Sequence, residues 1–481
     1  MLTTLGWYRT CHPNPLHFTF CIESLIQNLK SIDMTIATLP TLLTQDEALS
    51  LVESAIKHSQ AEGVFVSLNA SESALSRFSE NQISQNISRN RFTLTITSYF
   101  GKRSASASTT EINSDSITET IRRSEDMARI APEDPEWVSL LEPQEYDHRL
   151  PAFDENTVTL SPLARGEIVQ QVTALAEQAG VEGSGTLSTK AFVDVVGNST
   201  GLRSCDRGTE ADFSFTARIG DGSSWSERTA FAIADLPIES MTEELIERAF
   251  SSRHPREVTP GAYPVVFNPA AFADLLGWTI WNLDARAADE GRSFMSRTDE
   301  AGKPAGNRVG EQIFSPLVQV QRNPAHPLLQ LGTCFGDGLS NRYLEVIKDG
   351  IPQTLSYSRY WSQQQGKEPT GSLFPMVMTG SDRSLAELIA QTERGILVSR
   401  AWYVRYINPR TLEVTGMTRD GTFWIEDGQI AYPIKNLRFN QSLPDMLRDV
   451  DGLSTVQRFG NSIVPGVRVK AFNFSSVTDS I

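Results

Sequence analysis

The chain has 481 residues and 40% of them are hydrophobic, enough for about two to four domains with a substantial buried core. Its net charge of −15 and the absence of any Lys/Arg run longer than a pair argue against binding to a nucleic-acid backbone, because such binding needs clustered cations. The 4 cysteines are too few and too scattered for a disulfide framework, and no apolar run approaches the ~18 residues that span a bilayer. We therefore expect a globular, cytoplasmic protein with protein or peptide partners.

Residues 1–33 are expected to be a leader that is either disordered or an over-extended translation start. Pro13 and Pro15 interrupt this segment, which lacks the continuous apolar core of a signal peptide. It also contains two thiols and two imidazoles, the ligands that tetrahedral zinc prefers: Cys11, His12, His17 and Cys21. The adjacent Cys-His pair does not have the spacing of a zinc knuckle, so we favour a leader over a metal site, with Met34 as the cleaner start.

Helices are expected over residues 44–60, 116–130, 163–180 and 241–253. In the first, Thr44 can cap the helix with Glu47 three residues later, and the apolar face consists of Ala48, Leu51, Val52 and Ile56. The third helix is expected to end at Gly180. Residues 150–162 are polar and bracketed by prolines, so they are expected to be a connector.

The segments between these helices have the alternation of antiparallel strands. Residues 64–109 alternate apolar and polar side chains through several short runs, and residues 190–233 read as strand, turn and strand. The glycine-bearing turn at 220–222 indicates a hairpin. We place a domain boundary near Thr259, which gives an N-terminal domain over 34–258 and a C-terminal domain over 259–481.

The C-terminal domain is expected to begin with a strand at 264–267 and a helix. The buried face of that helix is predicted by spacings of four, four and three between Phe272, Leu276, Ile280 and Leu283. Asp-Gly pairs at 349–350 and 427–428 indicate hairpins. Between them, Ser384 and Glu387 form a capping box on a helix that is expected to end at Gly395. Helices between mostly antiparallel strands predict an α+β fold with two domains.

Few residues offer recognisable chemistry. None of the 6 histidines lies one turn from another on an expected helix, as in the paired ligands of zinc peptidases. Cys334 lies in a glycine-bearing loop without an identifiable base, so a buried or incidental cysteine is favoured over a nucleophile. Asp337 in the same loop could accept a substrate amine, although turn chemistry is the alternative. Trp278 and Trp281 either pack in the core or form a wall for a bound peptide.

Five motifs in order give the chain a family resemblance: RFTLTITSYFGKRSASASTT, VVGNSTGLRSC, VIKDGIPQTL, ERGILV and FWIEDGQIAYPIKNLRFNQSLPDML. From about Glu47 to the C-terminus the chain resembles the TldD/PmbA family, and more closely its PmbA (TldE) branch. The resemblance implies a cytoplasmic α+β protein of two domains. It also implies that TldD subunits carry an HExxxH zinc motif on the helix after the first strand of the C-terminal domain.

In this chain the HExxxH positions are occupied by Gly277, Trp278 and Asn282, none of which can replace its counterpart. The C-terminal cysteine of the family is also absent from the matching stretch, residues 454–467. The resemblance therefore implies no catalytic residue, metal or cofactor in this chain, and zinc in a TldD-type partner. For peptide binding, Trp278, Trp281 and Asp337 are the candidates.

Two functions follow from the resemblance. The first is a PmbA-like subunit without zinc in a cytoplasmic metallopeptidase, which processes or degrades unfolded or leader peptides as a heterodimer with a TldD-type zinc subunit. The second is a homodimeric peptide-binding or scaffold protein without catalytic activity. The family is also named as a modulator of DNA gyrase, but the acidic charge argues against direct contact with nucleic acid, and no membrane association is expected.

Overall fold

The computed structural model describes residues 42–146, 152–329 and 332–478. The expected leader, with Met34 and the four possible zinc ligands near the N-terminus, lies outside these described residues. None of the helices in the described ranges is long and apolar enough to cross a membrane.

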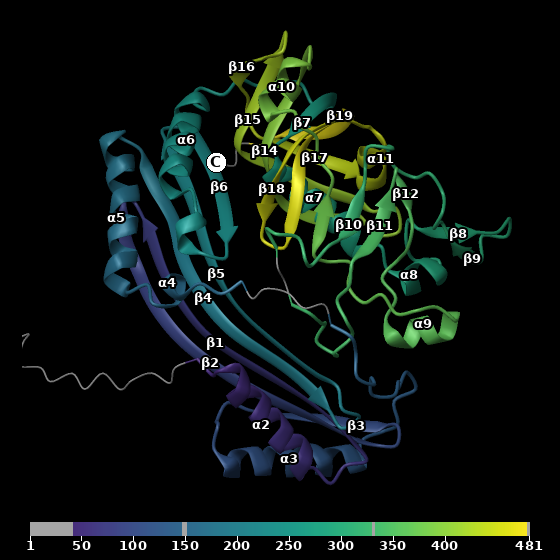
Figure 1. The fold of residues 1–481 in the computed structure, drawn as a ribbon. Helices are drawn as coiled ribbons and strands as arrows, with labels where there is room; N and C mark the ends of the chain where they lie inside the picture. Colours follow the sequence, from purple (N-terminus) through teal and green to yellow (C-terminus); the bar gives the residue numbers. More distant parts are fainter. Residues whose placement is uncertain (1–41, 147–151, 330–331, 479–481) are drawn as a thin grey trace, which may run out of the picture. The chain divides into compact units, whose positions relative to one another are not determined.

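The N-terminal half forms a six-stranded antiparallel sheet (Figure 1). Its strand order is β3-β2-β1-β4-β5-β6. The strands are β1 (Gly63–Ser79), β2 (Gln82–Phe100), β3 (Arg103–Thr109), β4 (Glu182–Asn198), β5 (Arg203–Ile219) and β6 (Gly222–Ala230). The hairpin predicted at 220–222 is confirmed, because β5 and β6 pair antiparallel across that turn.

The first two strands are longer than the sequence predicted. The antiparallel strands expected over residues 64–109 are present, but the first two are not short: β1 has 17 residues and β2 has 19. Glu80 and Asn81 adopt φ angles of 53° and 59°, which lets two residues reverse the chain. Beyond a register shift between Arg77 and Phe78, the polar stretch pairs regularly, with Ser76 opposite Asn86 and Ser71 opposite Arg91. Cross-strand pairing therefore continues through residues whose composition resembles a loop.

Helices cover one face of this sheet at two places (Figure 1). Near one end of β1, α2 (Gln45–His58) and α3 (Ser114–Ile130) share an apolar cluster with the strands. Elsewhere α5 (Pro162–Gln178) and α6 (Ile238–Ser251) pack on a second cluster. A short helix, α4 (Glu155–Val158), occurs within the segment that was expected to be only a connector.

The predicted capping box of α2 is confirmed. The Glu47 backbone N–H donates to Thr44 Oγ1 at 3.2 Å, and the Thr44 backbone N–H donates to Glu47 Oε2 at 2.8 Å. These two bonds satisfy donors that the first turn of a helix leaves unpaired.

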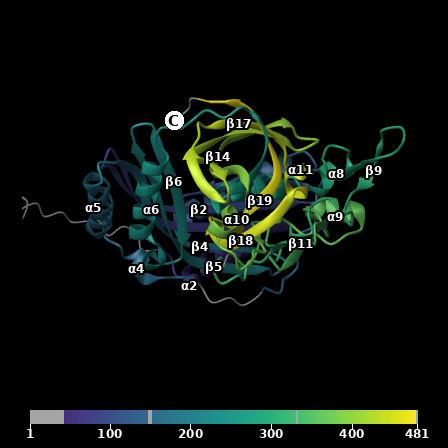
Figure 2. The same cartoon turned by 90° about the horizontal axis from the view of Figure 1, so that it is seen from above.

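The C-terminal half forms an 11-stranded mixed sheet, mostly antiparallel (Figures 1 and 2). Only β13–β19 and β14–β7 pair in parallel among its described strands. The strands are β7 (Gly261–Phe267), β10 (Val320–Arg322), β11 (Leu344–Lys348), β12 (Ile351–Pro352), β13 (Met376–Met378), β14 (Arg394–Asn408), β15 (Glu413–Glu426), β16 (Gln429–Pro433), β17 (Leu437–Ser442), β18 (Val450–Phe459) and β19 (Ser462–Val477). The strands β8 (Ser296–Thr298) and β9 (Pro304–Asn307) form a separate pair, and the shorter helices are α8 (Ala285–Asp289), α9 (Arg359–Gln365), α10 (Leu385–Ala390) and α11 (Leu443–Arg448).

Both predicted Asp-Gly hairpins are confirmed. Asp349 and Gly350 have φ angles of 49° and 76° between β11 and β12, and Asp427 and Gly428 have 51° and 73° between β15 and β16. Position 350 also requires glycine for space, since a Cβ there would lie 2.3 Å from the carbonyl oxygen of Phe314. Local turn chemistry therefore fixes these two reversals.

The helix predicted after Ser384 is confirmed at its start and wrong at its end. The Ser384–Glu387 capping box is present, but α10 ends at Ala390. Gly395 instead lies in β14, where a Cβ would come within 2.7 Å of the carbonyl oxygen of Pro264 on β7. This glycine therefore permits close approach of two strands and does not end the helix.

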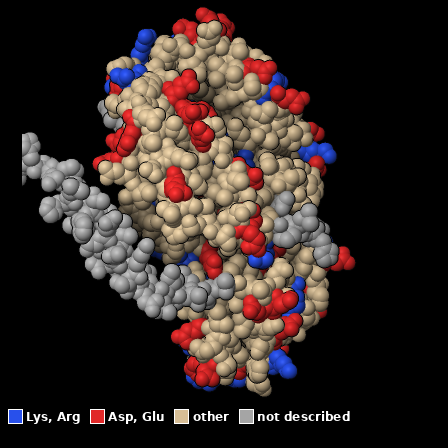
Figure 3. Space-filling view, turned by 60° about the vertical axis from the view of Figure 1, so that its left-hand side comes forward, with Lys and Arg blue, Asp and Glu red and all other residues tan. Residues whose placement is uncertain are grey.

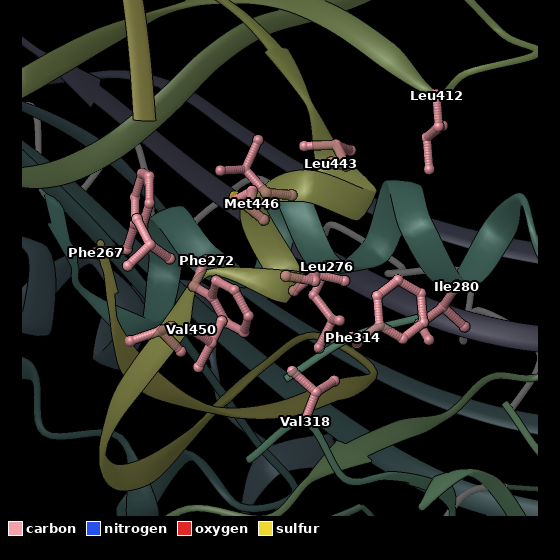
Figure 4. Close-up of a cluster of buried hydrophobic side chains, with 14 of the residues drawn as sticks. Phe267, Phe272, Leu276, Ile280, Phe314, Val318, Leu412, Leu443, Met446 and Val450 are labelled. Carbon is pink, nitrogen blue, oxygen red and sulfur yellow. The ribbon is translucent and has the colours of Figure 1, made fainter. Parts of the chain in front are cut away.

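The helix α7 (Pro269–Trp281) crosses the core of the C-terminal domain (Figure 4). It begins at Asn268, whose Oδ1 accepts the backbone N–H of Ala271 at 2.9 Å. Phe272, Leu276 and Ile280 are buried together, as their spacing predicted. The α+β class predicted from the sequence is therefore confirmed, and α7 is anchored by one apolar face.

Substitution of a buried residue of α7 should destabilise the protein far more than substitution of an exposed one. We expect Phe272→Ala to lower the free energy of unfolding by about 3–5 kcal/mol, because a fully buried phenyl ring would leave a cavity. Trp281→Ala serves as the control, since Trp281 is 72% exposed on the same helix. Denaturant titrations of both variants measure the effect, and equal losses would contradict the assignment of the two faces.

Candidate functional site

The three positions of the degenerate motif lie at the C-terminal end of α7. The helix ends at Trp281, and Asn282 is its C-cap residue. Gly277 has room for a side chain, because a Cβ there would make only an ordinary contact, 3.8 Å from the Cε of Met376. Neither the backbone nor close packing therefore demands glycine at this position.

Trp278 and Asn282 are joined through Tyr406 of β14. The Trp278 and Tyr406 rings meet edge to face, with centroids 4.7 Å apart. The Tyr406 hydroxyl donates to Asn282 Oδ1 at 3.0 Å, and Asn282 Nδ2 donates to the carbonyl oxygen of Trp278 at 2.7 Å. Both ends of the asparagine amide are thus engaged in closing the helix. The sequence analysis did not identify Tyr406, although the aromatic run after the ERGILV motif could have indicated it.

The residues at the motif positions do not fit a zinc ion. Zinc is bound in proteins by thiolate, imidazole or carboxylate ligands. Gly277 has no ligand atom, the indole of Trp278 carries only an N–H donor, and the amide of Asn282 is already hydrogen-bonded. Across the described ranges, no group of three His, Cys, Asp or Glu side chains could hold a metal ion. No metal-dependent step can therefore be derived from these residues.

A pocket of about 590 Å³ lies beside the end of α7. Trp281 and Asn282 line it, together with Arg292 and Phe374. Trp281 is the more accessible tryptophan, whereas Trp278 is half-buried against the core. The structure thus brings two of the sequence-predicted residues to one pocket, whose mixture of aromatic and polar groups is typical of small-ligand sites.

Asp337 occupies a different loop and is not among the residues that line this pocket. Its Oδ1 accepts the backbone N–H of Leu339 at 3.1 Å, and its Oδ2 lies 4.0 Å from Arg359 Nη1. These contacts are the turn chemistry that the sequence analysis gave as the alternative. Its role as an acceptor for a substrate amine remains a prediction.

Neither cysteine in the described ranges has the properties of a nucleophile. Burial raises the pKa of the Cys334 thiol to about 11, and neighbouring carboxylates, including Asp206, act in the same direction. Burial likewise raises the pKa of Cys205 to about 11. Both side chains are therefore neutral thiols near pH 7, and this favours an incidental role for Cys334.

One ionisable residue on α7 is strongly perturbed. Asp274 lies one turn before the motif, and its pKa is raised from 3.8 to about 6. The main cause is desolvation, because the surrounding protein displaces water from around the carboxylate. The Glu227 carboxylate of β6 raises the pKa further, and the Arg400 guanidinium of β14 lowers it. Asp274 is nevertheless exposed to solvent, so a ligand can reach it.

Comparison with protein-family models gives two matches. The PmbA/TldA metallopeptidase C-terminal domain matches residues 260–476. The PmbA/TldA metallopeptidase domain 1 matches residues 64–128. The C-terminal match includes α7 and the whole of the candidate site around it.

Curated relatives are similar over most of the chain. Metalloprotease PmbA of Escherichia coli O157:H7 is 23% identical over 407 residues, which cover 78% of this chain and 85% of that protein. A Metalloprotease PmbA homolog of Haemophilus influenzae is 22% identical over 385 residues, which cover 74% of this chain and 79% of that protein.

Two solved structures share the fold. TldE from Thermococcus kodakarensis has a TM-score of 0.76 and 21% identity, and the match covers 89% of this chain and 100% of that one. A Bacteroides thetaiotaomicron protein named as a candidate modulator of DNA gyrase has a TM-score of 0.77 and 20% identity. That match covers 90% of this chain and 98% of the other. The likeness to these structures concerns the fold alone.

The purified full-length chain is expected to bind no stoichiometric zinc, because the motif helix presents no ligand pair. Elemental analysis after mild dialysis measures the zinc content. A full equivalent of tightly held zinc would contradict the prediction and would direct attention to Cys11, His12, His17 and Cys21, which lie outside the described residues.

Asp274→Asn should stabilise the protein at neutral pH. The folded state holds the Asp274 proton with a pKa of about 6, against 3.8 ordinarily, so ionisation lowers stability as the pH rises between these values. Above pH ~6 the full loss persists, and below pH ~3.8 both states are protonated and the effect disappears. We therefore expect a higher thermal midpoint for Asp274→Asn at pH ~7.5 and a difference that shrinks toward pH ~4.

The matched control for this variant is Asp235→Asn, which removes a charge from an exposed residue next to α6. It should leave the midpoint nearly unchanged at both pH values. A lower midpoint for Asp274→Asn at neutral pH would mean that the carboxylate makes a net stabilising contact, for which Arg400 would be the candidate.

Proposed function

Because the chain belongs to the PmbA/TldD metallopeptidase family, we propose that it is a PmbA-like subunit without zinc of its own, which acts beside a TldD-type subunit that carries the metal. The observation that carries this proposal is that the side chains at the C-terminal end of α7 bind one another and leave no metal ligand free. Trp278, Asn282 and Tyr406 bind one another where a metallopeptidase needs two ligands and a base.

The contribution of this chain is then to bind and orient a peptide. An exposed tryptophan beside a mixed polar and aromatic pocket supports this role, since such walls pack against side chains while polar groups fix the direction of the main chain. The substrates proposed are unfolded or leader peptides, whose extended chains expose both side chains and main chain. Hydrolysis belongs to the zinc of the partner.

An alternative is a homodimeric peptide-binding or scaffold protein without catalysis. The pocket beside Trp281 serves this function equally well, because binding needs no metal. The two proposals differ in their partner: the first requires a second, zinc-bearing chain, and the second requires only copies of this one.

A cytoplasmic location and the absence of nucleic-acid partners remain part of the proposal. On the face drawn in Figure 3, acidic and basic side chains are interspersed, and the basic ones form no continuous patch. A net charge of −15 would repel a phosphate backbone.

The decisive experiment measures cleavage of unfolded peptides by this chain, by a TldD-type subunit from the same cell, and by their mixture. We expect this chain alone to leave the peptides intact and the mixture to cleave them in a chelator-sensitive manner. Trp281→Ala should raise the KM of the mixture, because it removes the exposed wall of the pocket. The control is Leu163→Ala on α5, which removes another exposed apolar side chain, 73% accessible.

Each outcome discriminates between the proposals. Absence of cleavage by this chain and by the mixture, together with co-purification of like chains only, would support the scaffold. Chelator-sensitive hydrolysis by the isolated chain would contradict both. Restoring the motif with Gly277→His, Trp278→Glu and Asn282→His should not create activity, since zinc also needs a third ligand and a supporting shell.

A further inference from the structure

Four carboxylates, three on the N-terminal sheet and one on α7, form a row that we call the acidic row: Glu210, Asp212, Glu227 and Asp274. Glu210 and Asp212 lie two residues apart on β5, and β6 places Glu227 on the same face, because Asp212 pairs with Thr229 and Ser214 pairs with Glu227. The opposite face of these strands packs on α5 and α6. The face with the carboxylates is directed toward the C-terminal domain, where β6 contacts β15 and β18 (Figure 1).

Electrostatic interactions connect Asp212 to Glu210 and Glu227, and Glu227 to Asp274. The surrounding protein raises the pKa of Glu227, and Asp212 adds to this shift, while Arg400 and Arg228 oppose it. The pKa of Glu210 is also raised, mainly by burial and then by Asp212. Glu227 in turn contributes to the raised pKa of Asp274 on α7. The row is therefore a continuous run of mutually repelling negative charges from β5 to α7.

The arginines near the centre of the row have other partners. Arg400 Nη1 lies 2.7 Å from Asp420 Oδ2, and its guanidinium is stacked between the rings of Trp225 and Trp402, at 3.7 and 4.2 Å from their centroids. Arg228 donates to Gln457 Oε1 at 3.1 Å and to Ser226 and the backbone of Glu227. Asp420, which lies outside the row, therefore neutralises Arg400, whereas Arg228 keeps its charge beside the row because its partners are neutral groups.

Lys190 and Arg458 face the Glu210 end of the row. Lys190 pairs with Glu210 across β4 and β5, and its Nζ lies 5.3 Å from the ring centroid of Phe192. Arg458 of β18 is only 8% exposed, and its Nε donates to the carbonyl oxygen of Gly460 at 3.0 Å. Its Nη2 makes no hydrogen bond and lies 3.9 Å from Glu210 Oε2.

Arg458 Nη2 lacks a hydrogen-bond acceptor, and the carboxylates of the acidic row lie beside it. A ligand that carries both a carbonyl oxygen and a cationic group would therefore suit this site. A buried guanidinium N–H without an acceptor is costly, so a carbonyl oxygen placed there would be stabilised. The carboxylates nearby would stabilise a cation on the same ligand. A metal ion does not fit, because no three of the carboxylates in the described ranges converge closely enough to hold one.

We propose that the acidic row binds the primary ammonium group of a peptide, while Arg458 Nη2 donates a hydrogen bond to a carbonyl oxygen of the same peptide. This inference rests on the proposed function, since it names the part of the peptide that this subunit recognises. The ammonium can come from the amino terminus or from a lysine side chain. Glu227 and Asp274 are both exposed to solvent and are therefore accessible to it.

The test measures binding of three extended fluorescent peptides to the full-length chain. The first has a free amino terminus and no lysine, the second is its N-acetylated form, and the third is acetylated but contains one central lysine. We expect the first to bind about tenfold more tightly than the second, as one charge-assisted interaction would give. Tight binding of the first and third peptides alike would show that the row accepts either ammonium group. Binding of the third like the second would assign the row to the amino terminus, and tight binding of the third alone would assign it to lysine side chains.

The variant Glu227→Gln with Asp274→Asn removes two of the four charges without changing side-chain size. It should abolish the preference for the free amine and leave the acetylated peptide unaffected. It should also fold normally, because it relieves repulsion between carboxylates. The matched control, Asp235→Asn with Glu243→Gln, removes two charges from exposed residues outside the row and should retain the preference.

The preference for the peptide with a free amine over its acetylated form should also depend on pH. Deprotonation of Asp274, whose pKa is about 6, completes the charge of the row, so the preference should increase as the pH rises through that value. The groups that face Asp274 are Glu227 and Arg400. Arginine side chains do not titrate near neutral pH, so the carboxylates determine the change in preference.

Equal binding of all three peptides by the unmodified chain, or an undiminished preference for the ammonium-bearing peptide in the double variant, would overturn the inference. These outcomes are separate from the test of the proposed function. Cleavage by the mixture without amine preference would leave the subunit role intact and remove the acidic row as its recognition site. A clear preference without cleavage would retain the row and contradict the subunit role.

Discussion

Burial of one face of α7 determines which side chains of this helix a ligand can reach. Phe272, Leu276 and Ile280 are enclosed by the core together with Leu275, and a helix of 3.6 residues per turn then directs Asp274 and Trp281 away from that face. Asp274 and Trp281 are exposed for this reason. The packing that stabilises the helix therefore also selects which of its side chains a ligand can meet.

Local signals in the sequence were sufficient for several helix starts and turns. Capping boxes at Thr44 and Ser384 begin helices as expected, because the hydrogen bonds involved span only three residues. The Asp-Gly turns were equally predictable, since they depend on the backbone freedom of two residues. The position of the motif helix followed from its apolar spacing together with the family motifs.

The features that sequence reasoning missed all depend on pairing between distant segments. Gly395 has the position of a helix terminator along the chain, and only the neighbouring β7 shows that it permits strand contact. Tyr406 is separated from Asn282 by more than a hundred residues, yet their side chains share a hydrogen bond. The acidic row joins β5, β6 and α7 in the same way. No local pattern encodes such contacts, because the sheet registers create them.

The C-terminal end of α7 and its middle differ in electrostatic character, and this difference constrains what the chain can do. At the C-terminal end, Trp278, Asn282 and Tyr406 satisfy one another with neutral groups, so little driving force remains there for binding an ion. Earlier on the helix, Asp274 is an accessible carboxylate whose charged form is disfavoured by its surroundings. A cationic ligand that lowers this cost gains the corresponding free energy on binding. A positive charge supplied from outside the chain would therefore stabilise the ionised form of this helix carboxylate.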